Sequence, residues 1–206
     1  MNHLEIEVKF YLSDMSFIRN CIIGLGAESK GRVFETNIRF EDTDKNLARN
    51  KSLLRLRKDT RTTLTFKSEP LIKDDQYKVL RELEVEISSF SIMKLILESL
   101  GFYEEQRYEK HRETFVLKDA TLCLDAMPYG HFLEIEGSKR QIKKLASQIG
   151  LPWDKRIVLN YLAIFDIIKQ QSDLPFSDVT FDNFKDVNFS MNQCLPVIEV
   201  GRGKNI

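Results

Sequence analysis

The stretch Leu4-Glu5-Ile6-Glu7-Val8-Lys9-Phe10 decides the fold, because apolar and charged residues alternate strictly along it. A period of two residues is typical of a β-strand, so one face of this segment is apolar and the other is charged. Glu5 and Glu7 stand about 7 Å apart on the charged face, at a rise of roughly 3.3 Å per residue. Carboxylates that close repel each other unless a cation lies between them. The simpler alternative is a solvated edge strand whose charges prevent aggregation.

The same alternation recurs in seven later segments, so the charged face belongs to the whole chain rather than to one strand. These segments cover residues 33–41, 53–58, 63–67, 82–87, 107–117, 121–126 and 132–137. Apolar residues at helical spacing, with capping residues at the ends, predict helices over 14–25, 89–100, 138–149 and from 154 or 155 to about 170. Residues 68–78 show no periodicity and are predicted to form a mobile loop.

The charged faces carry Glu, Lys and Arg with few Thr or Ser residues between them, although Glu and Lys are depleted in ordinary strands. About eight antiparallel strands are enough to close a barrel with room for a ligand inside. We therefore predict an α+β fold, an eight-stranded antiparallel β-barrel whose charged residues face a central tunnel and whose apolar outer face is covered by helices. An open sheet with a solvated charged face is the alternative.

Composition limits the classes of partner. The chain has 206 residues and a formal net charge of zero, so no global field attracts nucleic acid or an anionic membrane. No apolar run approaches the ~20 residues of a membrane span. Residues 1–170 are predicted to form the tunnel domain. Residues 171–206, rich in Asp, Asn and Phe, are predicted to be a C-terminal extension that packs on the domain or is partly disordered.

The cysteines and the N-terminus indicate a cytoplasmic protein. Cys21, Cys123 and Cys194 are scattered and suggest no disulfide framework, and the first residues lack the basic and apolar regions of a secretory signal. The sequence leaves a homodimer open.

The charges predicted to face the tunnel fall into two chemical sets. The cationic set is Lys9, Arg39, Arg55, Arg57, Lys67, Lys110 and Arg112. The acidic set is Glu5, Glu7, Glu84, Glu86, Asp125, Glu134 and Glu136. Arginine and lysine bind phosphate oxygens, whereas donor sets made only of carboxylates suit Mg²⁺ or Mn²⁺ better than zinc. Together they predict a tunnel for a polyphosphate bound with a divalent metal, in which catalysis is largely electrostatic.

The Glu-x-Glu-x-Lys pattern of Glu5, Glu7 and Lys9 resembles the signature of the CYTH superfamily, also called triphosphate tunnel metalloenzymes. Further similar motifs follow in the family's order over roughly residues 3–165: Leu54-Arg55-Leu56-Arg57, Thr65-Phe66-Lys67, Glu84-Val85-Glu86, Lys110-His111-Arg112, Leu124-Asp125 and Phe132-Leu133-Glu134-Ile135-Glu136. The resemblance implies a tunnel barrel in which the acidic set carries the metal and the cationic set holds the triphosphate, with Lys9 and Lys67 as catalytic cations.

The resemblance implies several reactions. We favour hydrolysis of inorganic, thiamine or nucleoside triphosphate over class IV adenylate cyclase activity, because no stretch is typical of an adenine pocket. The cyclase pattern also usually has an aromatic residue where Arg39 stands. A tunnel that binds polyphosphate or nucleotide without turnover is the third alternative.

Overall fold

Eight antiparallel strands form the centre of the molecule. The computed structural model describes residues 4–70 and 74–201. The strands are β1 (Leu4–Leu12), β2 (Glu28–Asp42), β3 (Ser52–Lys58), β4 (Thr62–Ser68), β5 (Lys78–Glu86), β6 (Phe102–Leu117), β7 (Ala120–Met127) and β8 (Gly130–Glu136). All eight predicted strands are therefore present, and the longest, β2 and β6, pair along most of their lengths.

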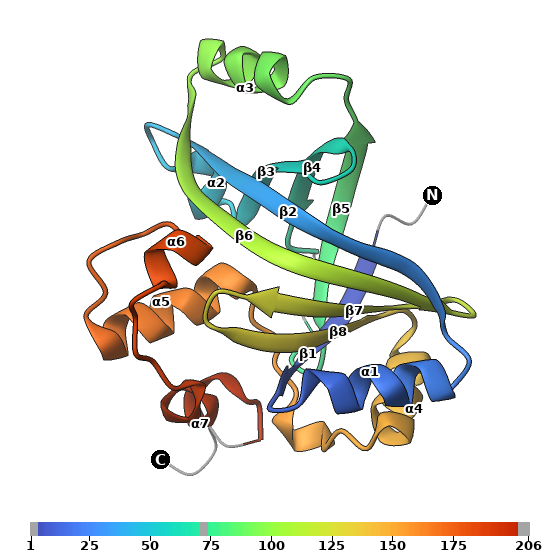
Figure 1. Cartoon of the computed structure of the whole chain (residues 1–206). Helices are drawn as coiled ribbons and strands as arrows, with labels where there is room; N and C mark the ends of the chain where they lie inside the picture. The colour runs from blue at the N-terminus through green and yellow to red at the C-terminus, as the bar shows by residue number, and fades with distance from the viewer. Residues whose placement is uncertain (1–3, 71–73, 202–206) are drawn as a thin grey trace.

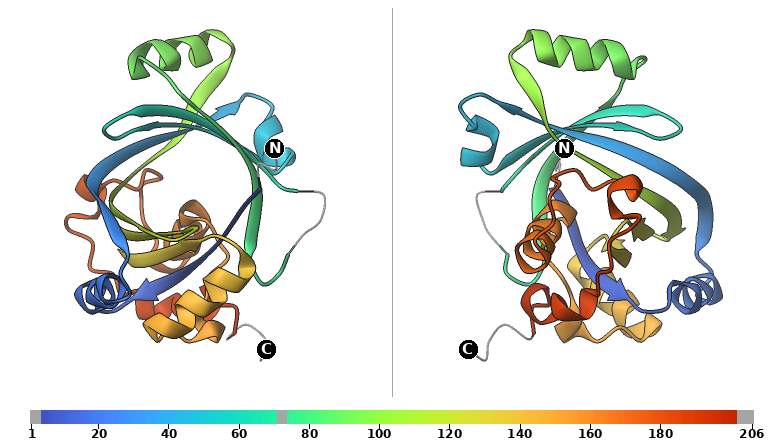
Figure 2. Two further views of the ribbon diagram at one scale, coloured as in Figure 1. Left: turned by 90° about the vertical axis from the view of Figure 1, so that its right-hand side faces the viewer. Right: turned by 60° about the vertical axis from the view of Figure 1, so that its left-hand side comes forward.

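The strands close into a barrel in the order β1-β5-β4-β3-β2-β6-β7-β8. Closure comes from the first and last strands, which pair from Glu7 opposite Glu136 to Leu12 opposite His131. In the left view of Figure 2 the strands enclose a ring with the helices around it. The predicted antiparallel barrel with external helices is confirmed, and the open-sheet alternative is wrong.

Two helices, α1 (Met15–Gly24) and α4 (Lys139–Ile149), cover one side of the barrel (Figure 1). Ile22 of α1 and Ile142 of α4 are fully buried against the outward apolar residues of β1, β7 and β8, such as Val8 and Leu122. Asp14 and Ser138 cap the two helices at their N-termini. The apolar face of the alternating strands therefore points outward, which leaves the charged face inside.

The opposite end of the sheet carries α2 (Asn46–Arg49) and α3 (Phe90–Ser99), with Ser89 as the N-cap of α3. Leu97 of α3 packs with Ile38, Phe40 and Leu56 in a small hydrophobic cluster. Figure 1 shows α3 at the end of the molecule that lies farthest from α1 and α4.

The predicted fourth helix starts later than the sequence indicates. Residues Trp153–Lys155 form only a 3-10 turn, η1, and helix α5 spans Tyr161–Ser172 with Asn160 as its N-cap. Between them Ile157 forms an antiparallel bridge with Lys9, with N···O distances of 2.9 and 2.7 Å. This bridge holds residues 156–160 extended, so the helical pattern of the sequence is overridden there, and the first turn of α5 meets the barrel interior.

The last part of the chain packs on α5 and on β6. It contains α6 (Phe181–Phe184), the 3-10 turn η2 (Met191–Gln193) and α7 (Leu195–Ile198). Val179 pairs with Tyr108 of β6, and Phe184 contacts the ring of Phe165 at 6.0 Å between centroids. Residues 202–206 of the predicted extension lie outside the described residues.

The predicted loop over 68–78 is shorter than expected, because Ser68 ends β4 and Lys78 already begins β5. Residues 71–73 of that loop lie outside the described residues. Within residues 4–70 and 74–201, no helix has the length and apolar character needed to cross a bilayer.

Candidate functional site

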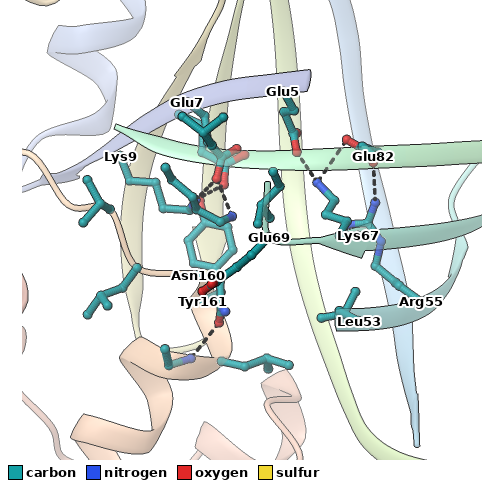
Figure 3. Close-up of a pocket in the computed structure, with 18 of the residues that line it drawn as sticks. Glu5, Glu7, Lys9, Leu53, Arg55, Lys67, Glu69, Glu82, Asn160 and Tyr161 are labelled. Carbon is teal, nitrogen blue, oxygen red and sulfur yellow. Dashed lines mark hydrogen bonds and ion pairs between the residues drawn. The ribbon is translucent and has the colours of Figure 1, made fainter. Parts of the chain in front are cut away.

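A cavity of about 710 Å³ runs into the barrel and is lined by the inner faces of its strands. Every residue that the sequence analysis proposes for the site lines this cavity except Glu86 and Asp125. Figure 3 shows Glu5, Glu7 and Lys9 of β1 entering it beside Lys67, Glu82 and Arg55, with Tyr161 and Asn160 of the α5 segment approaching from another side.

Strand order separates the charges by sign. The neighbouring strands β3, β2 and β6 supply Arg55, Arg57, Arg39, Lys110 and Arg112, which we call the basic wall. The neighbouring strands β8, β1 and β5 supply Glu134, Glu136, Glu5, Glu7, Glu82 and Glu84, which we call the acidic wall. A ligand between these walls meets guanidinium and ammonium groups on one side and carboxylates on the other.

Lys9 is buried within the acidic wall. Its Nζ lies 2.5 Å from Glu7 and 2.9 Å from Glu134, and the residue is only 1% exposed. Burial by itself lowers the pKa of this ammonium, but Glu134 and Glu7 outweigh burial and raise it. Lys9 therefore stays charged at physiological pH and acts as a fixed cation, not as a proton acceptor.

Two further lysines lie between carboxylates of the acidic wall. Lys67 Nζ is 2.5 Å from Glu5 and 3.1 Å from Glu82, and Lys78 Nζ is 2.6 Å from Glu7. Among the described residues, no three Asp, Glu, His or Cys side chains are gathered into a preformed ion site. The ammonium groups hold the carboxylates apart, each as the counter-ion of one or two of them.

Among the described residues, none of these lysines forms an ion pair with Glu136. Burial, followed by the charges of Glu5, Glu7 and Glu82, raises the pKa of Glu136 to about 7. Burial and the charge of Glu7 also raise the pKa of Glu5 despite its contact with Lys67. The six carboxylates of the acidic wall outnumber the three lysines between them, Lys9, Lys67 and Lys78.

The basic wall is anchored from behind by Asp125, which is fully buried. Its carboxylate accepts hydrogen bonds from Arg112 Nε at 2.6 Å, Lys110 at 3.1 Å and the Tyr161 hydroxyl at 2.7 Å. Lys9 and Lys110 each lie 5.1 Å from the centre of the Tyr161 ring. With both oxygens engaged by three donors, Asp125 positions cations and does not line the cavity.

Glu35 of β2 is the second buried anchor of the basic wall. It is 1% exposed, and its carboxylate lies 3.6 Å from Lys110 and 3.8 Å from Arg112. Burial alone raises the pKa of Glu35, but Lys110, Arg112, Arg57 and Arg55 outweigh burial and bring it to about 2. Glu35 is therefore ionised at any pH at which the protein functions.

The strands β2, β3 and β4 carry buried polar atoms without hydrogen-bond partners among the described residues. They are Glu35 Oε2, both amide atoms of Asn37, Arg55 Nε, Arg57 Nε and Thr63 Oγ1. Asn37, Arg57 and Thr63 form one row across the three strands, because each is the register partner of the next. Of these residues only Arg55 and Arg57 line the cavity, so the unpaired atoms of Asn37, Thr63 and Glu35 lie behind its wall.

Two predicted metal ligands take other positions. Glu86 lies at the end of β5, where its side chain is 59% exposed and pairs with Arg61 at 3.4 Å. Asp125 accepts hydrogen bonds from Arg112, Lys110 and Tyr161 with both carboxylate oxygens. The pair of β5 carboxylates that lines the cavity is Glu82 and Glu84, so the sequence analysis placed this pair two residues too far along the strand.

Three further residues of the site were not predicted from the sequence: Lys78, Glu35 and Tyr161. Lys78 fell in the predicted loop, although its spacing of four residues from Glu82 already placed it in phase with that strand. Glu35 is in phase with Arg39 on β2, so alternation alone already places it on the tunnel face. Tyr161 gave no local signal, because it reaches the barrel through the bridge between Ile157 and Lys9.

The CYTH domain profile matches residues 3–151, and the chain belongs to the CYTH domain family. A protein from Vibrio parahaemolyticus, described as a proposed adenylate cyclase, has a similar structure with a TM-score of 0.71. The two share 19% identity over 81% of this chain and 99% of that chain. A protein from Pyrococcus horikoshii OT3 has a TM-score of 0.66 at 27% identity, covering 76% and 96% of the two chains.

A proposed adenylyl cyclase from Hippeastrum, described as having a dominant triphosphatase activity, is similar with a TM-score of 0.58 and 20% identity. The match covers 79% of this chain and 95% of that chain. No curated protein sequence matches the chain significantly.

Proposed function

We propose that the protein is a metal-dependent phosphohydrolase that acts on a triphosphate held in the barrel. The observation that carries the proposal is that a basic wall and an acidic wall face each other across one cavity. The basic wall presents guanidinium and ammonium groups, and the acidic wall carries six carboxylates against three lysines, Lys9, Lys67 and Lys78. A polyphosphate bound with a divalent cation matches both walls at once.

The donor chemistry of the acidic wall fits the Mg²⁺ or Mn²⁺ that the family implies. Its donors near Glu136 are carboxylate oxygens only, and Glu7 is the direct register partner of Glu136 across β1 and β8. Like charges placed directly opposite each other destabilise a sheet, and a shared divalent cation removes that cost. Glu5, Glu7, Glu134 and Glu136 are the residues that would hold the metal, with Glu82 and Glu84 from β5 at the same cavity.

The side chains of the cavity have separate roles in phosphate binding and in charge stabilisation. A divalent metal held there would offset the negative charge on the phosphoryl oxygens and lower the pKa of a bound water molecule. Arg55 and Arg57 offer planar guanidinium groups that bind phosphate oxygens in pairs. Lys9 and Lys67 both have raised pKa values in spite of burial, because of Glu134 and Glu7 for Lys9 and of Glu5 for Lys67, so they contribute charge and do not transfer protons.

Hydrolysis is favoured over cyclisation for two reasons. Arg39 contributes another cation to the cavity, at the place where the cyclase pattern usually has an aromatic residue. In addition, the Hippeastrum protein is described as a proposed cyclase with a dominant triphosphatase activity. Cyclisation is the second candidate, because the similar Vibrio protein is described as a proposed adenylate cyclase.

The test is product analysis with tripolyphosphate, thiamine triphosphate and ATP, in the presence of Mg²⁺ or Mn²⁺. We expect orthophosphate release that stops when the metal is chelated. Glu136→Gln should abolish release because it removes a ligand charge, whereas Glu86→Gln, the matched control on an exposed carboxylate, should retain it. Cyclic AMP and pyrophosphate from ATP would identify a cyclase, and affinity without any product would identify a binding protein.

A further inference from the structure

Six of the eleven exposed large apolar side chains among the described residues lie on β5 and on α3, the helix that follows it, with its C-cap. We call them the α3 face. Its members, with exposed fractions from 37% to 69%, are Leu83, Val85, Ile92, Leu95, Ile96 and Leu100. None of them belongs to a hydrophobic cluster of the described residues, and none lines the cavity. The α3 face is therefore part neither of the core nor of the proposed active site.

Helix α3 is apolar on two sides. Phe90, Met93 and Leu97 pack toward the barrel, whereas the α3 face points away from it. The two charged residues of the helix, Lys94 and Glu98, pair with each other at 3.3 Å. A helix that is apolar almost all round is typical of a buried helix, because an ordinary surface helix is polar opposite its buried stripe. Figures 1 and 2 show no other described element on the outer side of α3, so this chain covers only one of its two apolar sides.

The apolar residues of the α3 face are arranged symmetrically. Ile92, Ile96 and Leu100 follow one another at intervals of four residues, so they form one ridge on the helix, centred on Ile96. A two-fold axis at Ile96 places Ile92 of one copy against Leu100 of a second copy, and Ile96 against itself. Ridges of this spacing pack into the grooves of a second helix in the commonest class of helix pairs. The ridge is therefore self-complementary, as a two-fold symmetric interface requires.

The area of the α3 face also suits a second copy of the chain. At roughly 30 Å² of apolar surface per carbon atom, the exposed parts of the six side chains present about 400 Å². Homodimer interfaces are about 65% apolar, so this area corresponds to about 1,200 Å² of interface summed over two copies. That value reaches the lower limit of about 1,200 Å² for specific, stable interfaces.

A lipid surface suits the α3 face less well. Helices that lie on membranes carry several Lys or Arg residues along their polar side. The only lysine of α3, Lys94, is paired with Glu98 and Glu104, and the helix has no arginine. The charges of α3 therefore offer no attraction to anionic lipid headgroups.

We propose that the α3 face is the interface of a symmetric homodimer, in which α3 crosses α3 of a second copy at Ile96. The outer face of β5, with Leu83 and Val85, extends this interface from the helix onto the barrel. The inference goes beyond the proposed function, because the α3 face lies outside the cavity. The dimer and the phosphohydrolase activity can therefore be tested, and can fail, separately.

Sedimentation velocity of the full chain from about 1 to 100 µM covers the weaker affinities of interfaces of this size. We expect wild type to sediment as a species of twice 24.1 kDa. Ile96→Glu should weaken association by about 100-fold or more, because the two-fold axis brings two carboxylates together. Phe17→Glu is the matched control and should remain dimeric, since Phe17 is also exposed but lies on α1, outside the α3 face.

An equimolar mixture of Ile96→Glu and Ile96→Lys tests the symmetry itself. Each variant alone should be monomeric, whereas the mixture should form a heterodimer, because opposite charges then meet on the axis. Circular dichroism verifies that both variants are folded. Leu100→Glu is a second variant on the same ridge, in case either substitution of Ile96 disrupts the fold, and it should also be monomeric.

Wild type that is monomeric at about 100 µM overturns the inference, and so does a Phe17→Glu variant that dissociates as Ile96→Glu does. A mixture of the two Ile96 variants that stays monomeric, or wild-type species that grow beyond two copies, excludes the two-fold axis at Ile96. Vesicles of phosphatidylcholine and phosphatidylglycerol provide the remaining test. Wild type that binds them as a monomer, with binding lost in Ile96→Glu, would assign the α3 face to a lipid surface instead.

Discussion

Neutralising Glu35 tests how the basic wall is held in place. The Glu35→Gln variant keeps the shape of the side chain and removes its charge, leaving Lys110 and Arg112 with one buried carboxylate fewer. The pKa of Glu35 is about 2 in the folded protein, against an ordinary value of 4.5. A difference of about 2.5 pKa units corresponds to about 3 kcal/mol of folding stability at 1.36 kcal/mol per unit. Because Glu35 is 1% exposed, solvent screening does not reduce this figure much.

The dependence on pH follows from the direction of this shift. The folded state holds the ionised form more strongly than the unfolded chain does, so the stabilisation is fully present above pH 4.5 and is lost as the pH falls through about 2. The destabilisation of Glu35→Gln relative to wild type should therefore be about 3 kcal/mol at pH 7 and only about 1.4 kcal/mol at pH 3, where wild type has begun to lose the same stabilisation.

Urea unfolding followed by circular dichroism at pH 7, 5, 4 and 3 measures both values. Glu28→Gln is the control, because Glu28 lies on the same strand but its side chain is 70% exposed, and its pairing with Lys30 should contribute little. A Glu35→Gln penalty that is the same at pH 7 and pH 3 would refute the linkage argument. A variant more stable than wild type would mean that the cost of burying the charge exceeds its attraction to Lys110 and Arg112.

Three further predictions concern other parts of the molecule. Arg57→Ala should weaken tripolyphosphate binding about 10- to 100-fold, because hydrogen bonds to charged groups are worth about 1.5–3 kcal/mol. Calorimetry should show a smaller loss of affinity for orthophosphate. Equal losses for the two ligands would exclude Arg57 as a polyphosphate contact. Phe184→Ala should lower the free energy of unfolding by about 3 kcal/mol, since Phe184 is 8% exposed among Phe165, Phe176 and Tyr129, and an unchanged urea midpoint would contradict this packing. Burial raises the pKa of Cys123 to about 12, so at pH 8 iodoacetamide should modify the half-buried Cys21 and leave Cys123 unmodified. Mass spectrometry measures both, and rapid labelling of Cys123 in the folded protein would refute this prediction.

Alternation was sufficient to predict the strands and their two faces, because a period of two residues is a local property of an extended backbone. It identified Glu5, Glu7 and Lys9 on one face of β1, and helical spacing predicted helices over 14–25, 89–100 and 138–149, where the structure has α1, α3 and α4. The excess of charged residues on the same face of eight segments was also enough to predict that this face is enclosed.

Tertiary structure alone decided how far along the barrel each charge lies. Glu82, Glu84 and Glu86 are equivalent by alternation, and only pairing with β4 and β1 shows that the first two line the cavity. Likewise, Asp125 is in phase with the tunnel residues, but its oxygens accept hydrogen bonds from Arg112, Lys110 and Tyr161. Local sequence fixes the face of a strand, whereas cross-strand register and contacts with distant segments fix the height of a side chain and its partners.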